Sequence, residues 1–176
     1  MKVKTIYLAG VPASGKTTIF KRIREKLFVD AETLSFGKCK YIQAGQYYMI
    51  GVFDGSTFEG TDKLSMTAID DCIAFILQLE QKQDRSVVFV EGDRLFNERF
   101  FLQTNARGLV IGADENVLKA RHAARDNQTE TFLKGRATKV ARMAAKFKLT
   151  KLRNNTLYDS EIITKGLIQT AEQWIK

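Results

Sequence analysis

Short apolar runs alternate along the chain with segments in which hydrophobic residues recur every three or four positions. The apolar runs predict buried strands at residues 3–8, 87–90, 109–111 and 149–152. The helical spacing predicts helices at residues 16–27, 64–79, 95–102 and 162–174, with further helices between the third strand and residue 148. Strands that alternate with helices favour a parallel sheet covered on both faces, so we expect an α/β fold.

The stretch after the first helix is rich in glycine and aromatic residues, which is typical of strands and turns. The segments KCKYIQ (38–43) and YYMIGVFD (47–54) predict a β-hairpin that turns near Ala44 and Gly45. Thr61 or Asp62 is suited to cap the helix that follows, because both side chains accept hydrogen bonds from free backbone amides.

The composition is compatible with one domain. The chain has 176 residues, of which 44% are hydrophobic, enough for one well-packed core and too few for two ordinary domains. Two cysteines, Cys39 and Cys72, are far apart in sequence and His122 is the one histidine, so we expect a reducing compartment and no zinc site. No apolar run reaches membrane-spanning length, so we expect a soluble cytoplasmic protein without a membrane partner.

Residues 10–17, with the sequence GVPASGKT, match the phosphate-loop pattern G-x-x-x-x-G-K-[ST] letter for letter. The match follows a predicted strand and precedes a predicted helix, whose N-terminus favours an anion. In this pattern Lys16 reaches the β- and γ-phosphates, and the hydroxyl of Thr17 binds Mg²⁺. We therefore expect ATP and Mg²⁺ to bind here, with nucleotide contacts from Gly10, Ala13, Ser14, Gly15, Lys16, Thr17 and Thr18.

Positive charge is concentrated in one segment. Residues 119–153 contain eleven lysines and arginines and two acids, a net charge of +9, whereas the whole chain carries +8. Such a segment suits the lid of a small-molecule kinase, whose arginines close over the triphosphate, and it also suits contact with a nucleic-acid backbone. A solvated helix face without a ligand is the third interpretation. On one helix, the basic edge that would meet the substrate contains Arg136, Lys139 and Arg142.

Carboxylates determine the phosphate chemistry that is available, because transfer needs one group to organise Mg²⁺ and another to orient the attacking hydroxyl. Glu91 and Asp93 follow an apolar strand, where they would hold the metal, and Arg94 beside them would contact a phosphate. An ordinary turn at the end of a strand is the alternative. Asp54 is the preferred base, and Asp62 is its rival, although an aspartate that begins a helix is commonly a cap.

The phosphate loop, the acidic turn, the basic segment and the late sequence LRNNT together resemble P-loop nucleoside and nucleotide kinases along nearly the whole chain. The resemblance implies a single domain over residues 1–176 with a P-loop NTPase fold. That fold has a five-stranded, mostly parallel sheet flanked by helices, here with a small β-hairpin insertion and an arginine-rich helical lid. The resemblance also implies that Arg121 and Arg125 are lid residues that act with Lys16 in catalysis. It implies that Asn154 or Asn155 lies beside the nucleotide base.

Two stretches, GVFDGSTFEGTDKLSM (51–66) and TETFLKGRATK (129–139), resemble a narrower family, the bacteriophage kinases that phosphorylate 5-hydroxymethyluracil in DNA. This resemblance implies an enzyme of DNA modification in the host cytoplasm, with a base hydroxymethyl group as the phosphate acceptor. A base in DNA must leave the stack to reach a γ-phosphate. The aromatic residues available to stack on it are Phe58, Phe53, Tyr47 and Tyr48.

The sequence departs in two places from the patterns of other P-loop kinases, which weakens its assignment to those families. Glu91 stands where many P-loop kinases carry Asp, and the chain lacks the Asp-Arg-Tyr or Glu-Arg-Ser triplet of some thymidylate and deoxynucleoside kinases. A kinase of a free nucleoside or nucleotide is the second hypothesis. A nucleotide-binding module without transferase activity is the third, although the chain has no Asn-Lys-x-Asp guanine motif and a simple switch needs no arginine cluster.

Overall fold

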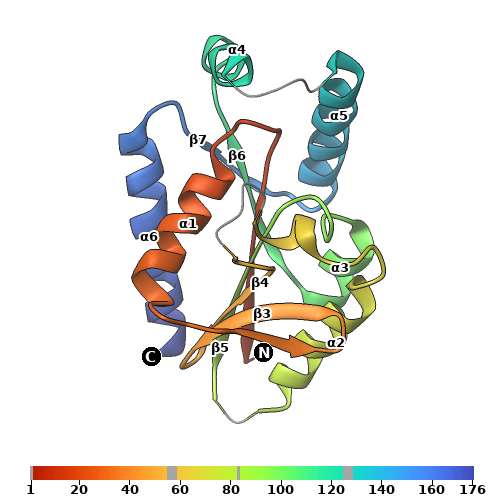
Figure 1. Cartoon of the computed structure of the whole chain (residues 1–176), viewed down its shortest axis with the longest axis vertical. Coiled ribbons are helices and arrows are strands. Elements are labelled where there is room, and N and C mark those ends of the chain that lie inside the picture. Colours follow the sequence, from red (N-terminus) through yellow and green to blue (C-terminus); the bar gives the residue numbers. More distant parts are fainter. Residues whose placement is uncertain (1, 55–58, 83, 125–128) are drawn as a thin grey trace.

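Seven strands form one sheet, in the spatial order β2-β3-β4-β5-β1-β6-β7 (Figure 1). The computed structural model describes residues 2–54, 59–82, 84–124 and 129–176. The strands are β1 (Val3–Ala9), β2 (Thr33–Phe36), β3 (Cys39–Ala44), β4 (Tyr47–Ile50), β5 (Ser86–Glu91), β6 (Arg107–Gly112) and β7 (Thr150–Arg153). The helices are α1 (Lys16–Leu27), α2 (Ile69–Glu80), α3 (Glu98–Thr104), α4 (Glu115–Ala123), α5 (Glu130–Lys146) and α6 (Leu157–Ile175), with a short 3-10 helix η1 (Thr61–Lys63).

The central strand is β1, which pairs in parallel with β5 on one side and with β6 on the other. β4 and β7 add one parallel strand on each side, which gives the five-stranded parallel core that the sequence predicts. The α/β fold class is therefore confirmed. Because the chain leaves β1 toward neighbours on opposite sides, the strand order reverses at β1, and ligands of open parallel sheets bind at the carboxyl ends of strands beside such a point.

The predicted hairpin is present as β3 and β4, which are antiparallel and turn at Gly45 (φ 57°). It extends the main sheet and is not a separate insertion, because β4 also pairs with β5. β2, which the sequence did not predict, pairs with β3 and brings the sheet to seven strands. Three of its four residues are exposed, so β2 lacks the apolar pattern that marks a buried strand.

Helices cover both faces of the sheet, with α1 and α6 on one face and α2, α3 and α5 on the other (Figure 1). Successive residues of β1 alternate between the two layers: Ile6 and Leu8 face α1 and α6, whereas Tyr7 and Ala9 face the other helices. Burial on both faces explains why the strand is largely apolar. No helix in the described part of the chain is long and apolar enough to cross a membrane.

Two helices begin later than the sequence predicts. α2 begins at Ile69 and not at residue 64, because η1 comes first and Leu64 then has an extended backbone (φ −67°, ψ 152°). Neither Thr61 nor Asp62 caps α2, whose N-cap residue is Ala68. α3 begins at Glu98 and not at residue 95, because the side chain of Asn97 caps it by accepting a hydrogen bond from the amide of Phe100 at 3.0 Å.

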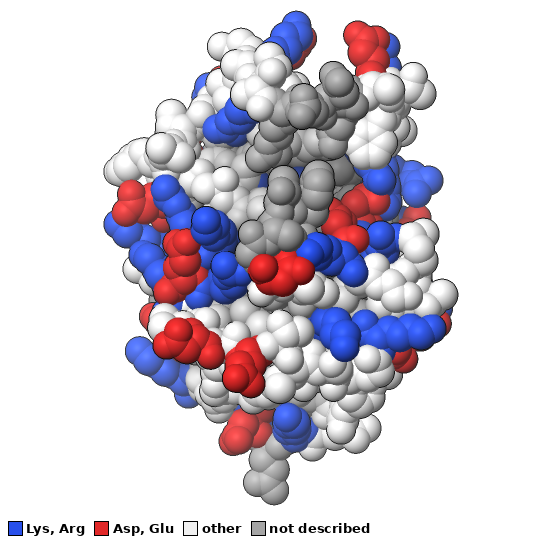
Figure 2. All heavy atoms as spheres, in the orientation of Figure 1, with Lys and Arg blue, Asp and Glu red and all other residues white. Residues whose placement is uncertain are grey.

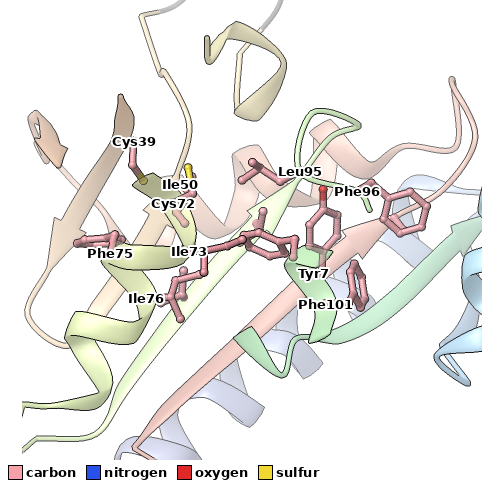
Figure 3. Close-up of a cluster of buried hydrophobic side chains, with 14 of the residues drawn as sticks. Tyr7, Cys39, Ile50, Cys72, Ile73, Phe75, Ile76, Leu95, Phe96 and Phe101 are labelled. Carbon is pink, nitrogen blue, oxygen red and sulfur yellow. The ribbon is translucent and has the colours of Figure 1, made fainter. Parts of the chain in front are cut away.

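The larger hydrophobic cluster gathers around Tyr7 and joins α2 and α3 to the sheet (Figure 3). Cys39 of β3 and Cys72 of α2 lie together in this cluster, although they are far apart in sequence. Both thiols are free and fully buried. The hydrogen bond with Cys72, followed by burial, raises the pKa of the Cys39 thiol, so this thiol stays protonated and unreactive.

The C-terminus of α5 offers a test of backbone strain. The amide of Leu149 donates to the carbonyl of Ala144 at 3.0 Å, which closes a Schellman motif. Lys148 holds the left-handed position of that motif (φ 50°), a conformation that usually belongs to glycine.

Lys148→Gly should therefore raise the free energy of unfolding by about 0.5–1 kcal/mol, because glycine adopts positive φ without a Cβ clash. Urea denaturation measures the change. Ala141→Gly, at an exposed interior position of the same helix, is the matched control and should lower the free energy of unfolding by about 1 kcal/mol. Equal losses in both variants would contradict the assignment of strain to Lys148.

Candidate functional site

The phosphate-loop sequence lies between the end of β1 and the start of α1, at the carboxyl edge of the sheet. Three of its residues have positive φ: Gly10 (151°), Ala13 (60°) and Gly15 (91°). The ammonium group of Lys16 donates to the carbonyl oxygens of Gly10 at 2.9 Å and Val11 at 3.0 Å. The lysine thus folds back over its own loop and holds it closed.

Close packing beneath the loop explains both of its outer glycines. A Cβ atom on Gly10 would lie 2.3 Å from the carbonyl oxygen of Ile111, and one on Gly15 would lie 2.2 Å from the amide nitrogen of Asn154. Any side chain at either position would displace its neighbour. The loop is therefore seated directly on the ends of β6 and β7.

Asn154 is a buried clamp between the loop and α6. Its amide nitrogen donates to the carbonyl of Ser14 at 2.8 Å, and its amide oxygen accepts from the hydroxyl of Ser160 at 2.7 Å. Asn155 is placed differently: its side chain forms hydrogen bonds with the backbone amide (2.9 Å) and the carboxylate (2.8 Å) of Asp114. The expected contact of Asn155 with a nucleotide base stays a prediction.

Arg121 links α4 to the loop. Its guanidinium group donates to the carbonyls of Ala13 at 3.3 Å, Asn154 at 3.0 Å and Asn155 at 2.9 Å. Arg121 therefore lies against the phosphate loop, where three backbone oxygens hold it, and its role as a catalytic lid residue stays a prediction. The other predicted lid arginine, Arg125, lies outside the described residues, as does the predicted stacking residue Phe58.

Glu91 ends β5 beside the loop and is paired in register with Leu8 of β1. Its side chain is buried, with 4% exposed, and burial raises the pKa of its carboxyl group to about 7, although Lys16 lowers it and Asp62 raises it further. A buried carboxyl group that resists ionisation without a cation fits a position next to a metal.

A small cavity connects Glu91 with Thr17, and its remaining walls come from α1 and the segment after β4. It is lined by Thr17, Phe20, Lys21, Arg24, Phe53, Glu59, Gly60 and Glu91. No group of three or more metal-ligating side chains occurs among the described residues. Thr17 and Glu91 would therefore hold Mg²⁺ together with phosphate oxygens and water, as in other phosphate-loop sites. Ser14, whose buried hydroxyl has no partner among the described residues, likewise fits a loop that a phosphate completes.

Asp93 joins the acidic turn to the basic segment. Its carboxylate forms ion pairs with Arg136 and with Lys139, the second at 3.0 Å. The sequence predicted a metal ligand at Asp93 and substrate contacts at Arg136 and Lys139, and the structure places all three in one salt-bridge cluster. α5 is thereby attached to the end of β5.

The remaining predicted carboxylates lie on the same side of the loop. Asp54 is half exposed and pairs with Lys63 at 2.5 Å. Asp62 accepts a hydrogen bond from the amide of Asp93 at 3.0 Å, and its backbone carbonyl accepts one from Arg94 at 3.1 Å. Neither carboxylate is buried, so both are accessible to an incoming hydroxyl group.

Arg24 and Glu59 are site residues that the sequence analysis missed. They form a two-oxygen ion pair at 2.9 and 3.0 Å in the cavity wall, and the guanidinium group lies 5.6 Å from the ring centre of Phe53. Helical spacing from Thr17 points to Arg24, because residues 17, 20, 21 and 24 share one face of α1. No motif marks Glu59.

The charge of the basic segment is partly compensated in the folded chain. Besides the pairs with Asp93, Lys146 pairs with Glu98 at 2.5 Å and Arg153 pairs with Asp114. Arg142 is exposed. On the face shown in Figure 2, Lys and Arg side chains alternate with Asp and Glu side chains and do not form one continuous patch.

A glycine-rich phosphate loop between a central parallel strand and a helix defines the P-loop NTPase fold, and the chain has this fold. Among solved structures, YorR from Bacillus subtilis, in complex with phosphorylated GDP, is similar over 96% of both chains, with a TM-score of 0.51 and 15% identity. A gluconokinase from Sinorhizobium meliloti 1021 has a TM-score of 0.47 and 14% sequence identity, over 97% of this chain and 94% of its own. A shikimate kinase from Bacteroides thetaiotaomicron has a TM-score of 0.46 and 14% sequence identity, over 96% of this chain and 98% of its own. Models of known protein families do not match the chain, and neither do curated protein sequences.

Asn154→Ala should lower the free energy of unfolding by about 1–3 kcal/mol, because it removes the side-chain donor to the carbonyl of Ser14 and leaves the hydroxyl of Ser160 only the carbonyl of Thr156. Asn155→Ala is the matched control, since its side chain bonds are exposed, and it should cost less than Asn154→Ala. Thermal denaturation of both variants measures the difference. Equal losses would show that Asn154 is not a clamp.

Glu91→Gln should change how stability depends on pH. The folded protein holds the proton of Glu91 more tightly than the unfolded chain does, since its pKa is raised from 4.5 to about 7. Stability of the nucleotide-free protein therefore falls as pH rises through this range, and the glutamine variant escapes the loss. The variant should gain up to roughly 3 kcal/mol over the unmodified protein between pH 4.5 and 7.

Thermal denaturation between pH 4.5 and 8, in the absence of Mg²⁺, tests this prediction. Glu98→Gln is the matched control, because the hydrogen bond with Lys146 lowers the pKa of Glu98 below this range, so its difference from the unmodified protein should be nearly independent of pH. A pH-independent difference between Glu91→Gln and the unmodified protein would contradict the raised pKa.

Proposed function

We propose that the chain is an ATP-dependent phosphotransferase that transfers the γ-phosphate to a hydroxyl acceptor. The observation that carries the proposal is that Thr17 and buried Glu91 line one small cavity at the carboxyl edge of the sheet, with Lys16 close enough to lower the pKa of Glu91. A phosphate-binding lysine, a hydroxyl ligand and a carboxylate are the groups that phosphoryl transfer needs. A simple nucleotide switch would not require the cavity beside them.

The geometry supports the following roles in this proposal. Lys16 exchanges its bonds with Gly10 and Val11 for phosphate oxygens and stabilises the charge that develops on the moving group. Thr17 and Glu91 hold Mg²⁺, which neutralises negative charge on the phosphates. Asp54 is exposed and follows β4 in sequence. It orients the acceptor hydroxyl once its ion pair with Lys63 has opened.

For the acceptor we propose the hydroxymethyl group of 5-hydroxymethyluracil in DNA, which follows the resemblance of residues 51–66 and 129–139 to the phage DNA-base kinases. In this proposal Phe53 offers a ring beside the cavity for stacking of an extruded base. The exposed Arg142 and the cations that Asp93 holds would contact the DNA backbone.

A kinase of a free nucleoside or nucleotide is the second candidate, and one observation favours it. Asp93, Glu98 and Asp114 neutralise several cations of the basic segment, which weakens the field available to a long polyanion.

Transfer of γ-³²P from ATP with Mg²⁺ distinguishes these acceptors. The assay compares DNA that contains 5-hydroxymethyluracil, the same DNA with thymine, and a pool of free nucleosides and nucleotides. We expect label in the modified DNA, and label in the free pool alone would support the second candidate. Lys16→Ala should reduce the rate by roughly a hundredfold or more, whereas Lys26→Ala, exposed on the same helix, should not.

Asp54→Asn in the same assay should lower the rate by about a hundredfold or more while ATP affinity stays unchanged, since general-base contributions have this size. An unchanged rate would transfer the role to Asp62 or Asp93. If no acceptor is labelled although ATP binds through Lys16, the chain is a nucleotide-binding module and not a transferase.

A further inference from the structure

A second cavity lies at the edge of the sheet opposite to the phosphate loop. It has a volume of about 400 Å³ and is formed where α3 and α5 end and β6 and β7 begin. Since β1 and β6 are parallel, the six residues of β6 separate this cavity from the carboxyl edge by roughly 20 Å. The cavity therefore belongs to neither the nucleotide nor the acceptor site. Its size falls within the range of small-molecule sites.

The cavity combines an apolar wall with a cationic rim. Phe101 and Phe147, whose ring centres are 5.0 Å apart, form the wall with Leu149. Arg107 and Lys148 line the rim and are both exposed. In the described part of the chain, no ion pair includes either of them.

The positive charge of Arg107 at the rim affects the pKa of a neighbouring lysine. Lys4 of β1 has a lowered pKa because of burial and then because of the charge of Arg107. An anion bound beside Arg107 would reduce the repulsion between this arginine and Lys4.

Lys148 is placed at the rim at the expense of backbone strain. It has the left-handed conformation (φ 50°) that glycine would adopt more easily, and Asn105 on the other side of the cavity is also left-handed (φ 47°). These two residues follow the ends of α5 and α3 and line the cavity. Non-glycine residues with positive φ are concentrated at functional sites.

We propose that this cavity binds a small aromatic anion, with its ring against Phe147 and its acidic group between Arg107 and Lys148. An uncharged ring would not form an ion pair with either cation, and inorganic phosphate would not cover the apolar wall. The site is independent of the phosphotransferase function. The cavity residues Phe147 and Lys148 directly follow α5, the helix whose Arg136 and Lys139 pair with Asp93.

The probe for the test is 8-anilinonaphthalene-1-sulfonate, an aromatic anion that fluoresces in apolar surroundings. It is titrated into the full chain in the presence of saturating MgADP, which occupies the phosphate loop. We expect saturable binding. The uncharged analogue N-phenyl-1-naphthylamine should bind at least tenfold more weakly.

Two variants separate charge from cavity shape. Arg107→Ala with Lys148→Ala removes the cations, and Ala106→Trp fills the cavity without changing the charge. Each should weaken binding of the anionic probe at least tenfold. Lys134→Ala with Lys165→Ala, two exposed lysines elsewhere, removes the same charge and should change binding less than twofold.

A measurement on the unmodified protein keeps the test independent of variant folding. In ¹H–¹⁵N spectra, the probe should shift the amide signals of the residues that line the cavity, such as Gly108 and Phe147. Shifts confined to the phosphate loop or spread over the whole surface would overturn the proposal. So would a charge variant that weakens binding while Ala106→Trp does not, since this pattern indicates attraction to the surface charge alone.

Discussion

Burial of β1 on both faces is the constraint on which the rest of the structure depends. The strand lies between β5 and β6 with helices above and below, so its end cannot shift without disturbing two neighbours. The hydroxyl of Tyr7 donates to the carbonyl of Gly92 at 2.9 Å, which ties this strand to the acidic turn inside the core. The core, and not contacts within the site, therefore places the phosphate loop and the carboxyl group of Glu91 relative to each other.

The fold could be predicted where burial shaped the sequence. β1 and β5 are covered on both faces and show apolar runs, so their existence and parallel pairing followed directly. β2 was missed because it is an exposed edge strand, and α2 was extended too far because the buried Leu64 continues its apolar spacing without being helical. Hydrophobic spacing reports which side chains face the core, but it does not report backbone conformation.

In the candidate site, too, some features could be predicted from the sequence and others could not. The phosphate loop could be placed from its motif, because a motif encodes backbone geometry and its flanking elements together. The partners of Asp93, Arg121 and Asn154 could not, since each is fixed by residues more than thirty positions away. The basic segment, too, was a correct observation about composition, but part of its charge is neutralised by acids that only folding brings close.

The closed form of the phosphate loop has a consequence for selectivity among anions. An incoming ligand must displace Lys16 from two carbonyl oxygens, and each such hydrogen bond is worth about 1 kcal/mol net. A triphosphate replaces these bonds with many others along the loop, whereas a single inorganic phosphate or sulfate ion replaces few. The bonds of Lys16 with its own loop would thus lower the affinity of this site for a single small anion by up to about 2 kcal/mol, a cost that a triphosphate offsets more readily.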